Sequence, residues 1–183
     1  MNKDLVKSGK ILMGVGMLVM LTFASFDEGL VAVLIGMILT IVGAKRVQNG
    51  SRVPIVGKII ASMVIGGGSE LIGFGMFSTI LDKLDGDKVY NLLILLKNGN
   101  WRTLLPALII IAVGLMIDSY LFYLISGEMY KATEISTFKT AEKLYKISIW
   151  SIPLLFGIFI AFAAEIAFIV AGFSELVVQE ETA

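Results

Sequence analysis

The stretch Leu104–Ile125 reads LLPALIIIAVGLMIDSYLFYLI, and within it Ile109–Ile117 carries no charged, hydroxyl or amide side chain. The hydrocarbon core of a bilayer is about 30 Å thick, and an α-helix crosses it in about 20 mostly apolar residues. A segment of this length and composition is therefore predicted to be a transmembrane helix. Its one acidic residue, Asp118, lies well inside it.

Four further apolar stretches lie on either side of this segment. The predicted spans are about residues 9–26, 30–47, 55–81, 104–125 and 147–173, with polar connections at 82–103 and 126–146. We expect helix in the second connection, because Glu142 and Lys146 form a favourable i,i+4 pair. The first stretch has the layout of a signal peptide, but the next apolar segment follows so closely that we interpret it as a retained helix. Residues 1–183 are then one integral membrane domain.

Composition supports the same fold class. The chain of 183 residues is 57% hydrophobic and only 16% charged, whereas soluble domains average about 45–50% apolar and about 25% charged residues. Within lipid every backbone polar group needs an internal partner, and no alternating strand pattern is present, so helices are the remaining solution. We predict an all-α, polytopic bundle of about five transmembrane helices in the cell membrane, with the lipid bilayer as its first partner.

Lysine and arginine are distributed unevenly among the connections. They concentrate before the first span, between the second and third, and between the fourth and fifth. Cytoplasmic loops carry an excess of these residues. The pattern therefore predicts a cytoplasmic N-terminus and, for five spans, a C-terminus on the outside.

Missing residue types exclude several classes of function. The chain has no cysteine, no histidine and a formal net charge of zero. Disulfides, thiolate catalysis, histidine-held haem and the commonest metal ligand are therefore excluded. Without a basic tract, nucleic acid is not expected as a partner. We expect no enzymatic activity, no catalytic residue, no cofactor and no resident metal.

Two stretches together resemble a known family. Gly9–Gly16 (GKILMGVG) opens the first helix, and Thr137–Ile147 (TFKTAEKLYKI) leads into the last one. The second resembles the approach to the final helix in an archaeal multi-pass membrane family known as a domain of unknown function (number 996). The resemblance covers most of the chain, from Ser8 to Leu176. It implies a small archaeal multi-pass protein and brings no known catalytic or binding residue. Glu165 departs from the almost purely apolar final helix of that family.

Glu70 lies near the middle of the third span and follows Gly66-Gly67-Gly68-Ser69. Glycines weaken a helix, and carbonyls freed by a helix break beside a carboxylate can form a cation site, as in discontinuous transporter helices. Alternatively, the glycines let a neighbouring helix approach closely, and Glu70 is a protonated hydrogen-bond donor at that contact. Both interpretations remain open. Four other glycines are interpreted as close-packing positions: Gly14, Gly16, Gly36 and Gly43.

Two other acids are candidates for the same ion or proton site. Asp118 and Glu70 lie on antiparallel spans, and counting at about 1.5 Å per residue places them within about a turn of the same depth. They could share a proton or hold a cation. Asp118 could instead lie nearer the cytoplasmic boundary and meet Tyr120, Lys131 or water. Glu165 lies among alanines in the last span and could simply bond to a hydroxyl there.

These observations leave two functional interpretations. The first is a non-enzymatic accessory or assembly subunit, or an oligomeric scaffold, with partners that are further copies of this chain or other membrane subunits. The alternative is a proton- or cation-conducting channel or transporter that uses Glu70 and Asp118. An intramembrane enzyme is the least favoured class, because histidine and cysteine are absent.

Overall fold

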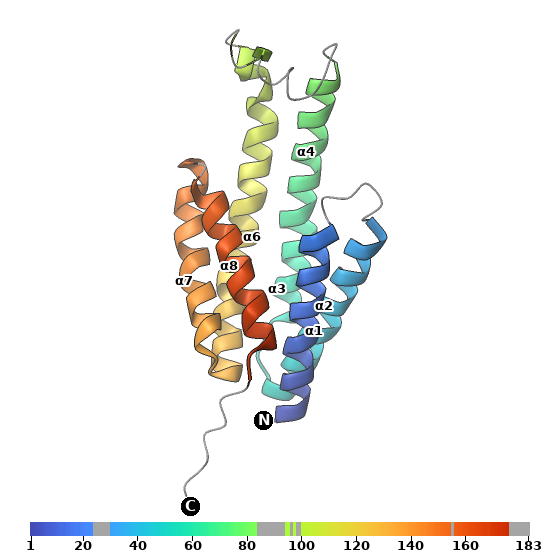
Figure 1. Ribbon diagram of the computed structural model, residues 1–183, viewed down its shortest axis with the longest axis vertical. Coiled ribbons are helices and arrows are strands. Elements are labelled where there is room, and N and C mark those ends of the chain that lie inside the picture. The colour runs from blue at the N-terminus through green and yellow to red at the C-terminus, as the bar shows by residue number, and fades with distance from the viewer. Residues whose placement is uncertain (24–29, 84–93, 96, 98–99, 155, 176–183) are drawn as a thin grey trace, which may run out of the picture.

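The structure is a computed structural model that describes residues 1–23, 30–83, 94–95, 97, 100–154 and 156–175. Within these residues every secondary-structure element is a helix (Figure 1). Five helical segments are long and apolar enough to cross a membrane: Lys3–Thr22, Leu30–Ser51, Val56–Asp82, Arg102–Thr133 and Phe156–Phe173. The predicted all-α bundle with five long apolar spans is confirmed, and the chain has the architecture of a polytopic membrane protein.

The first two helices form a tight antiparallel hairpin. α1 comprises Lys3–Phe23 and α2 comprises Leu30–Ser51. Glycines seven residues apart face one another: a Cβ atom on Gly9 would lie 2.6 Å from the Gly43 carbonyl oxygen, and one on Gly16 would lie 2.5 Å from that of Gly36. Only glycine permits such a close approach of two backbones. The prediction that Gly16, Gly36 and Gly43 are close-packing positions is confirmed here.

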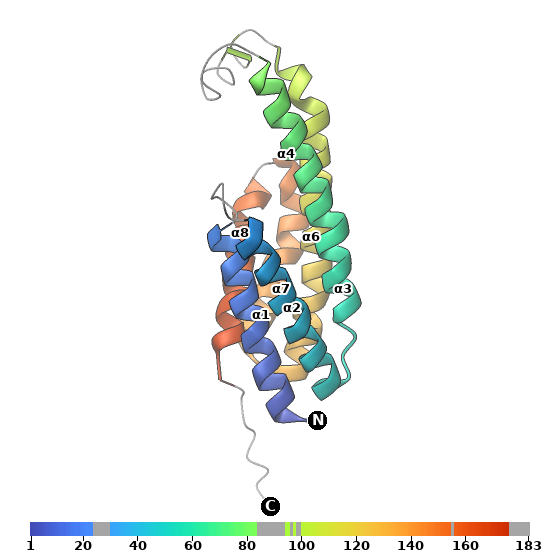
Figure 2. The same ribbon diagram turned by 90° about the vertical axis from the view of Figure 1, so that its right-hand side faces the viewer.

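A second antiparallel pair is longer and extends past the ends of the other helices (Figures 1 and 2). Its first arm runs through α3 (Val56–Ala61), the π-helical turn η1 (Ser62–Gly66) and α4 (Gly67–Asp82). Its second arm runs from the 3₁₀ turn η2 (Asn100–Leu104) into α6 (Leu105–Thr133), which ends at Glu134 with a left-handed φ of 58°. Most of the predicted connection 82–103 lies outside the described residues.

The predicted fifth span, 147–173, is wrong as one continuous helix. α7 covers Ser136–Ser151, the 3₁₀ turn η3 covers Ile152–Leu154, and α8 covers Phe156–Phe173. Pro153 lies in that turn, because proline lacks the N–H that a helix interior needs and its ring clashes with the preceding turn. The helix expected in the connection 126–146 is confirmed, shared between the end of α6 and α7.

α7 runs antiparallel to α6 and adds a sixth long helix to the bundle. The Phe122 ring stacks on Tyr145 with centroids 5.5 Å apart, and the position of Gly127 lies beside the Glu142 carboxylate. α8 then returns beside α7, where Phe138 and Phe168 meet edge to face at 5.1 Å. These aromatic rings form the core in which α6, α7 and α8 meet.

The described end of α8 lies beside the first half of α1. The Lys10 ammonium, 1% exposed, donates to the Gly172 carbonyl at 3.1 Å and also to the Ser174 carbonyl. Gly14 and Gly172 are in backbone contact at the same level, which confirms Gly14 as a close-packing position. The start of α1 and the described end of α8 therefore lie at the same end of the bundle, while the sides of the membrane on which the two ends of the chain lie stay a prediction. Because α7 is a further antiparallel helix between α6 and α8, the described part of the bundle has six long helices and not the five that the apolar spans imply.

Candidate functional site

Asp118 lies on α6 where that helix contacts the π-helical turn. The Ser62 hydroxyl of η1 donates to Asp118 Oδ1. A Cβ atom on Gly66 would lie 3.0 Å from both Cβ and Oδ1 of Asp118. The Asp118 side chain is therefore held against η1, and a larger residue at position 66 would press on it.

The helix remains continuous through the glycine run. The Gly67 N–H donates to the Ser62 carbonyl, five residues back, which makes Ser62–Gly66 a π-helical turn that leads directly into α4. The predicted helix break at Gly66–Ser69 is therefore wrong. One helical turn takes in an extra residue, and the helix continues without unwinding. Single π turns within α-helices are frequent at functional sites. The Gly66 carbonyl faces α6, since a Cβ atom on Gly114 would lie 3.0 Å from its oxygen.

The four residues of this run differ in their surroundings. Gly66 makes the predicted close approach to a neighbouring helix, whereas a Cβ atom on Gly67 or Gly68 would have nothing within 4 Å. Within this chain, Gly66 therefore makes a close helix–helix contact, whereas Gly67 and Gly68 make none. The Ser69 hydroxyl donates to the Ile65 carbonyl of its own helix at 2.6 Å.

Glu70 lies one helical turn along α4 from the Gly66–Asp118 contact. Its Cγ would be 3.1 Å from a Cβ atom on Gly114, and Gly114 lies one turn from Asp118 along α6. The charges of Glu70 and Asp118 are close enough to interact. The predicted depth match between these two acids, within about a turn, is confirmed.

Glu165 joins the same region from the third side. It lies near the middle of α8, next to the buried Ala164. Its charge lies within electrostatic range of Asp118, Glu70 and the buried Tyr145 of α7. Glu70, Asp118 and Glu165, one residue from each of α4, α6 and α8, are named here the acidic cluster; Glu70 and Asp118 are related by packing and Glu165 joins them through electrostatics.

Basic side chains lie elsewhere. Among the residues that the structure describes, ion pairs join Lys58 to Glu128 at 3.8 Å and Lys131 to Glu128 at 3.5 Å. Lys10 binds carbonyl groups at the end of α8. In the part of the chain that the structure describes, no group of three acidic side chains is arranged to hold a metal ion. What the cluster offers chemically is a set of carboxyl groups that influence one another's protonation.

Sequence reasoning missed two members of this region. Ser62 gives only a weak signal in the sequence, because three glycines follow in the same span, although a serine four residues before Gly66 falls on the same helical face. Tyr145 falls in the predicted polar connection 126–146, where its neighbours Lys143 and Lys146 carry charge. The helical spacing of Phe138, Ala141, Tyr145 and Ser148, all buried on one face of α7, was the signal that could have placed it.

Comparison with protein-family models, with curated proteins and with solved structures finds no match to this chain. Membership of the archaeal family with which two stretches share a pattern stays a prediction. The acidic cluster is consequently interpreted from its own geometry and chemistry.

Proposed function

We propose that this protein binds protons at the acidic cluster and conducts them across the cell membrane. The observation that supports the proposal is the convergence of Glu70, Asp118 and Glu165 from three helices, each of which is a candidate membrane span. Of the two functions that the sequence suggests, proton or cation conduction is therefore placed before the role of an accessory subunit. A small metal cation is the other species that such carboxylates could pass.

The energetic argument starts from the cost of acids within lipid. A charged carboxylate at the centre of a bilayer costs about 2.5–3.5 kcal/mol on insertion scales, so acids at that depth are rare and are functional candidates by default. Like charges within electrostatic range repel, so ionisation of one acid of the cluster disfavours ionisation of the others. In the proposed function a proton that enters at one acid favours release from the next. A hydroxyl at Ser62 holds Asp118 in place for that exchange.

Proton flux into liposomes tests the proposal. Purified protein is reconstituted around a pH-sensitive dye, and a potassium diffusion potential drives uptake. We expect uptake above that of protein-free liposomes, lost in Asp118→Asn and reduced in Glu70→Gln and Glu165→Gln. Glu134→Gln is the matched control, since Glu134 is exposed at the end of α6. Wild-type uptake equal to that of empty liposomes, or full uptake by Asp118→Asn, contradicts the proposal. Replacement of sodium by choline distinguishes protons from a metal cation.

The second candidate is a non-enzymatic accessory subunit or scaffold. The specific observation in its favour is the open face of α4, where Cβ atoms on Gly67, Gly68 and Gly75 would have nothing within 4 Å. Small residues permit close approach of a helix from another chain in the membrane. Mild-detergent extraction with a C-terminal tag tests it: stoichiometric companion chains support this candidate, whereas isolation of the chain alone with proton flux intact contradicts it.

A further inference from the structure

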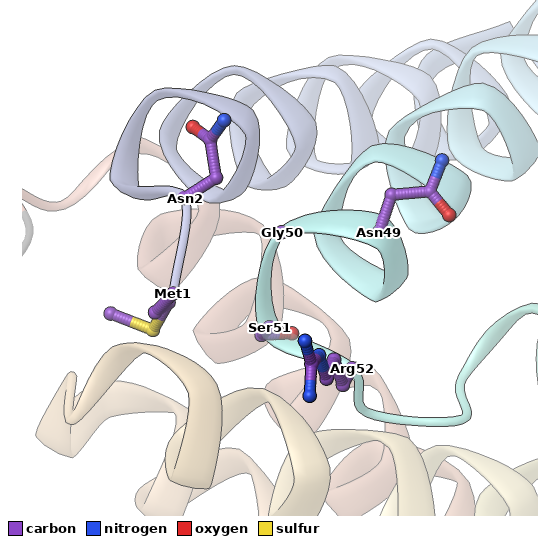
Figure 3. A pocket seen from close by; sticks show the side chains of 6 residues that line it. All are labelled: Met1, Asn2, Asn49, Gly50, Ser51 and Arg52. Atoms are coloured by element: carbon purple, nitrogen blue, oxygen red, sulfur yellow. The ribbon is translucent and has the colours of Figure 1, made fainter.

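A pocket lies at the end of the α1–α2 hairpin, away from the acidic cluster (Figure 3). Its volume is about 490 Å³, and it opens between the first residues of the chain and the last turn of α2. Its lining residues carry amide, hydroxyl and guanidinium groups and no carboxylate: Met1, Asn2, Asn49, Gly50, Ser51 and Arg52.

The walls of this pocket are fixed by backbone contacts. The Asn2 N–H donates to the Gly50 carbonyl at 2.8 Å, which continues the seven-residue register of the hairpin. The Arg52 N–H donates to the Gln48 carbonyl at 2.7 Å, and Arg52 has a φ of 64°. This left-handed residue ends α2 in the position that usually holds glycine. The opening between the two chain segments is therefore formed before any ligand arrives.

The polar groups of the lining suit an oxyanion. Arg52 offers five N–H donors in a planar fork that matches phosphate geometry. The Asn2 side-chain oxygen accepts from the Leu5 N–H at 3.2 Å, so its NH₂ group remains the donor that it can offer a ligand. Asn49 adds a second amide. The surrounding surface is basic, with Lys3, Lys45 and Arg46 exposed.

An apolar stripe leads along α2 toward the pocket. Leu34, Ile38 and Val42 are exposed at 50%, 60% and 41%, and their spacing of four residues places them on one side of the helix. Arg46 continues the same spacing, and Asn49 of the pocket lies one turn beyond Lys45. An acyl chain lying on this stripe would bring its own headgroup to the donors of the pocket.

We propose that this pocket binds a phosphate group, carried by an anionic phospholipid whose acyl chain lies along the stripe on α2. The site is independent of the acidic cluster and of proton conduction. Free phosphate shares the recognised chemistry, and the acyl stripe is what distinguishes the lipid from it. The Arg52 guanidinium provides the charge-assisted hydrogen bonds that hold such a group, whereas the side-chain amides of Asn2 and Asn49 point away from Arg52 in Figure 3 and line other parts of the pocket.

Lipid retention on the purified protein tests this assignment. The full chain is reconstituted with phosphatidylglycerol in phosphatidylcholine, extracted in mild detergent, and its bound lipids are counted by native mass spectrometry. We expect phosphatidylglycerol to be retained preferentially, and Arg52→Gln to weaken retention by about tenfold, the effect of losing one charge-assisted hydrogen-bond pair. Arg102→Gln is the matched control, because this exposed arginine lies beside the other end of the long hairpin. Equal retention of both lipids by the wild type overturns the proposal.

Two further variants keep the test decisive. Arg52→Gly removes the guanidinium from a left-handed residue where glycine is favoured, so the fold is kept while retention is lost. Arg52→Lys keeps the charge without the planar fork and should retain lipid at an intermediate level. Full retention by Arg52→Gly overturns the proposal. In a separate arm, inorganic phosphate that protects the wild type from thermal unfolding, without any preference among lipids, supports the phosphate chemistry and overturns the lipid as its source.

Discussion

Gly66 and Asp118 pack directly against each other, such that a Cβ atom at position 66 would lie 3.0 Å from the Asp118 carboxyl oxygen. The glycine therefore holds open the space that this acid of the cluster occupies. The Ser62 hydroxyl, one turn earlier, binds the same carboxyl group. The third span thus contacts Asp118 through two small residues on one face.

Substitution of Gly66 should damage both fold and conduction. Gly66→Val forces Asp118 out of its place, and overpacking of this kind costs about 1–3 kcal/mol. Gly67→Ala is the matched control: its Cβ atom meets open space, and alanine is favoured over glycine in a helix by about 1 kcal/mol. Thermal unfolding in detergent measures both. Gly67→Leu should also be tolerated by the isolated chain, because its side chain meets open space. Equal damage from Gly66→Val and Gly67→Ala would contradict the assigned contact.

Removal of the Ser62 hydroxyl isolates the hydrogen bond to Asp118. Ser62→Ala should lower the free energy of unfolding by about 1 kcal/mol, because the carboxyl group loses its donor in a partly buried contact. Ser69→Ala is the control, since the Ser69 hydroxyl bonds only the Ile65 carbonyl of its own helix. Unfolding in detergent, followed by circular dichroism, compares the two. A larger loss in Ser69→Ala would show that the bond to Asp118 has no special weight.

The acids of this site can be predicted from the sequence, whereas the π turn beside them cannot. Asp118, Glu70 and Glu165 stand out because acids interrupt apolar stretches, and the antiparallel order of the spans gives Glu70 and Asp118 their common depth. The π turn carries no such signal: the sequence of Ser62–Gly66 is compatible with an ordinary helix, and the extra residue is shown only by the hydrogen bond from the Gly67 N–H to the Ser62 carbonyl. Whether Gly67 and Gly68 contact another helix of the chain depends on which face of α4 packs against α6. A run of three glycines does not specify that face.

The path of the chain after α6 is a second feature that the sequence does not predict. Residues 147–173 are mostly apolar, so the sequence predicts a single span with Pro153 in its first turns. Proline is tolerated in the first turn of a helix but disrupts a helix interior. Here Ile147, Ile149 and Trp150 continue α7, and the reversal at η3 brings α8 back to Lys10. That reversal is stabilised by tertiary contacts, among them the aromatic contacts of α7 with α6 and α8.

The Lys10 contact with α8 should contribute measurably to stability. Lys10→Met keeps the buried volume but loses the bonds to the Gly172 and Ser174 carbonyls, and with them the favourable charge at a helix C-terminus. Hydrogen bonds to charged groups contribute about 1.5–3 kcal/mol. Lys7→Met, one turn away on the exposed side of α1, is the control. If both variants unfold at the same temperature in detergent, the contact carries no net stabilisation.

The glycine register of the first hairpin predicts steep sensitivity at its contact positions. Gly43→Ala places a Cβ atom 2.5 Å from the Gly9 carbonyl oxygen, a distance that side chains do not adopt, so α1 and α2 must separate. Gly57→Ala, where nothing lies within 4 Å, provides the comparison. We expect a clear fall in thermal stability for the first variant only. Equal stability of the two would mean that the helices of the hairpin do not approach as closely as the register requires.

The position of α8 relative to α1 predicts the membrane topology. The chain has no cysteine, so single cysteines can be introduced without a background. Lys3→Cys and Glu175→Cys should react with a membrane-impermeant maleimide from the same side of sealed vesicles, because Lys10 ties the start of α1 to the end of α8. Lys83→Cys, just past the far end of α4, should react from the opposite side. A bundle in which α7 reverses the chain within the membrane keeps those two ends on the same side. Labelling of Lys3→Cys and Glu175→Cys from opposite sides would therefore contradict this arrangement and favour five crossings, with α7 outside the membrane.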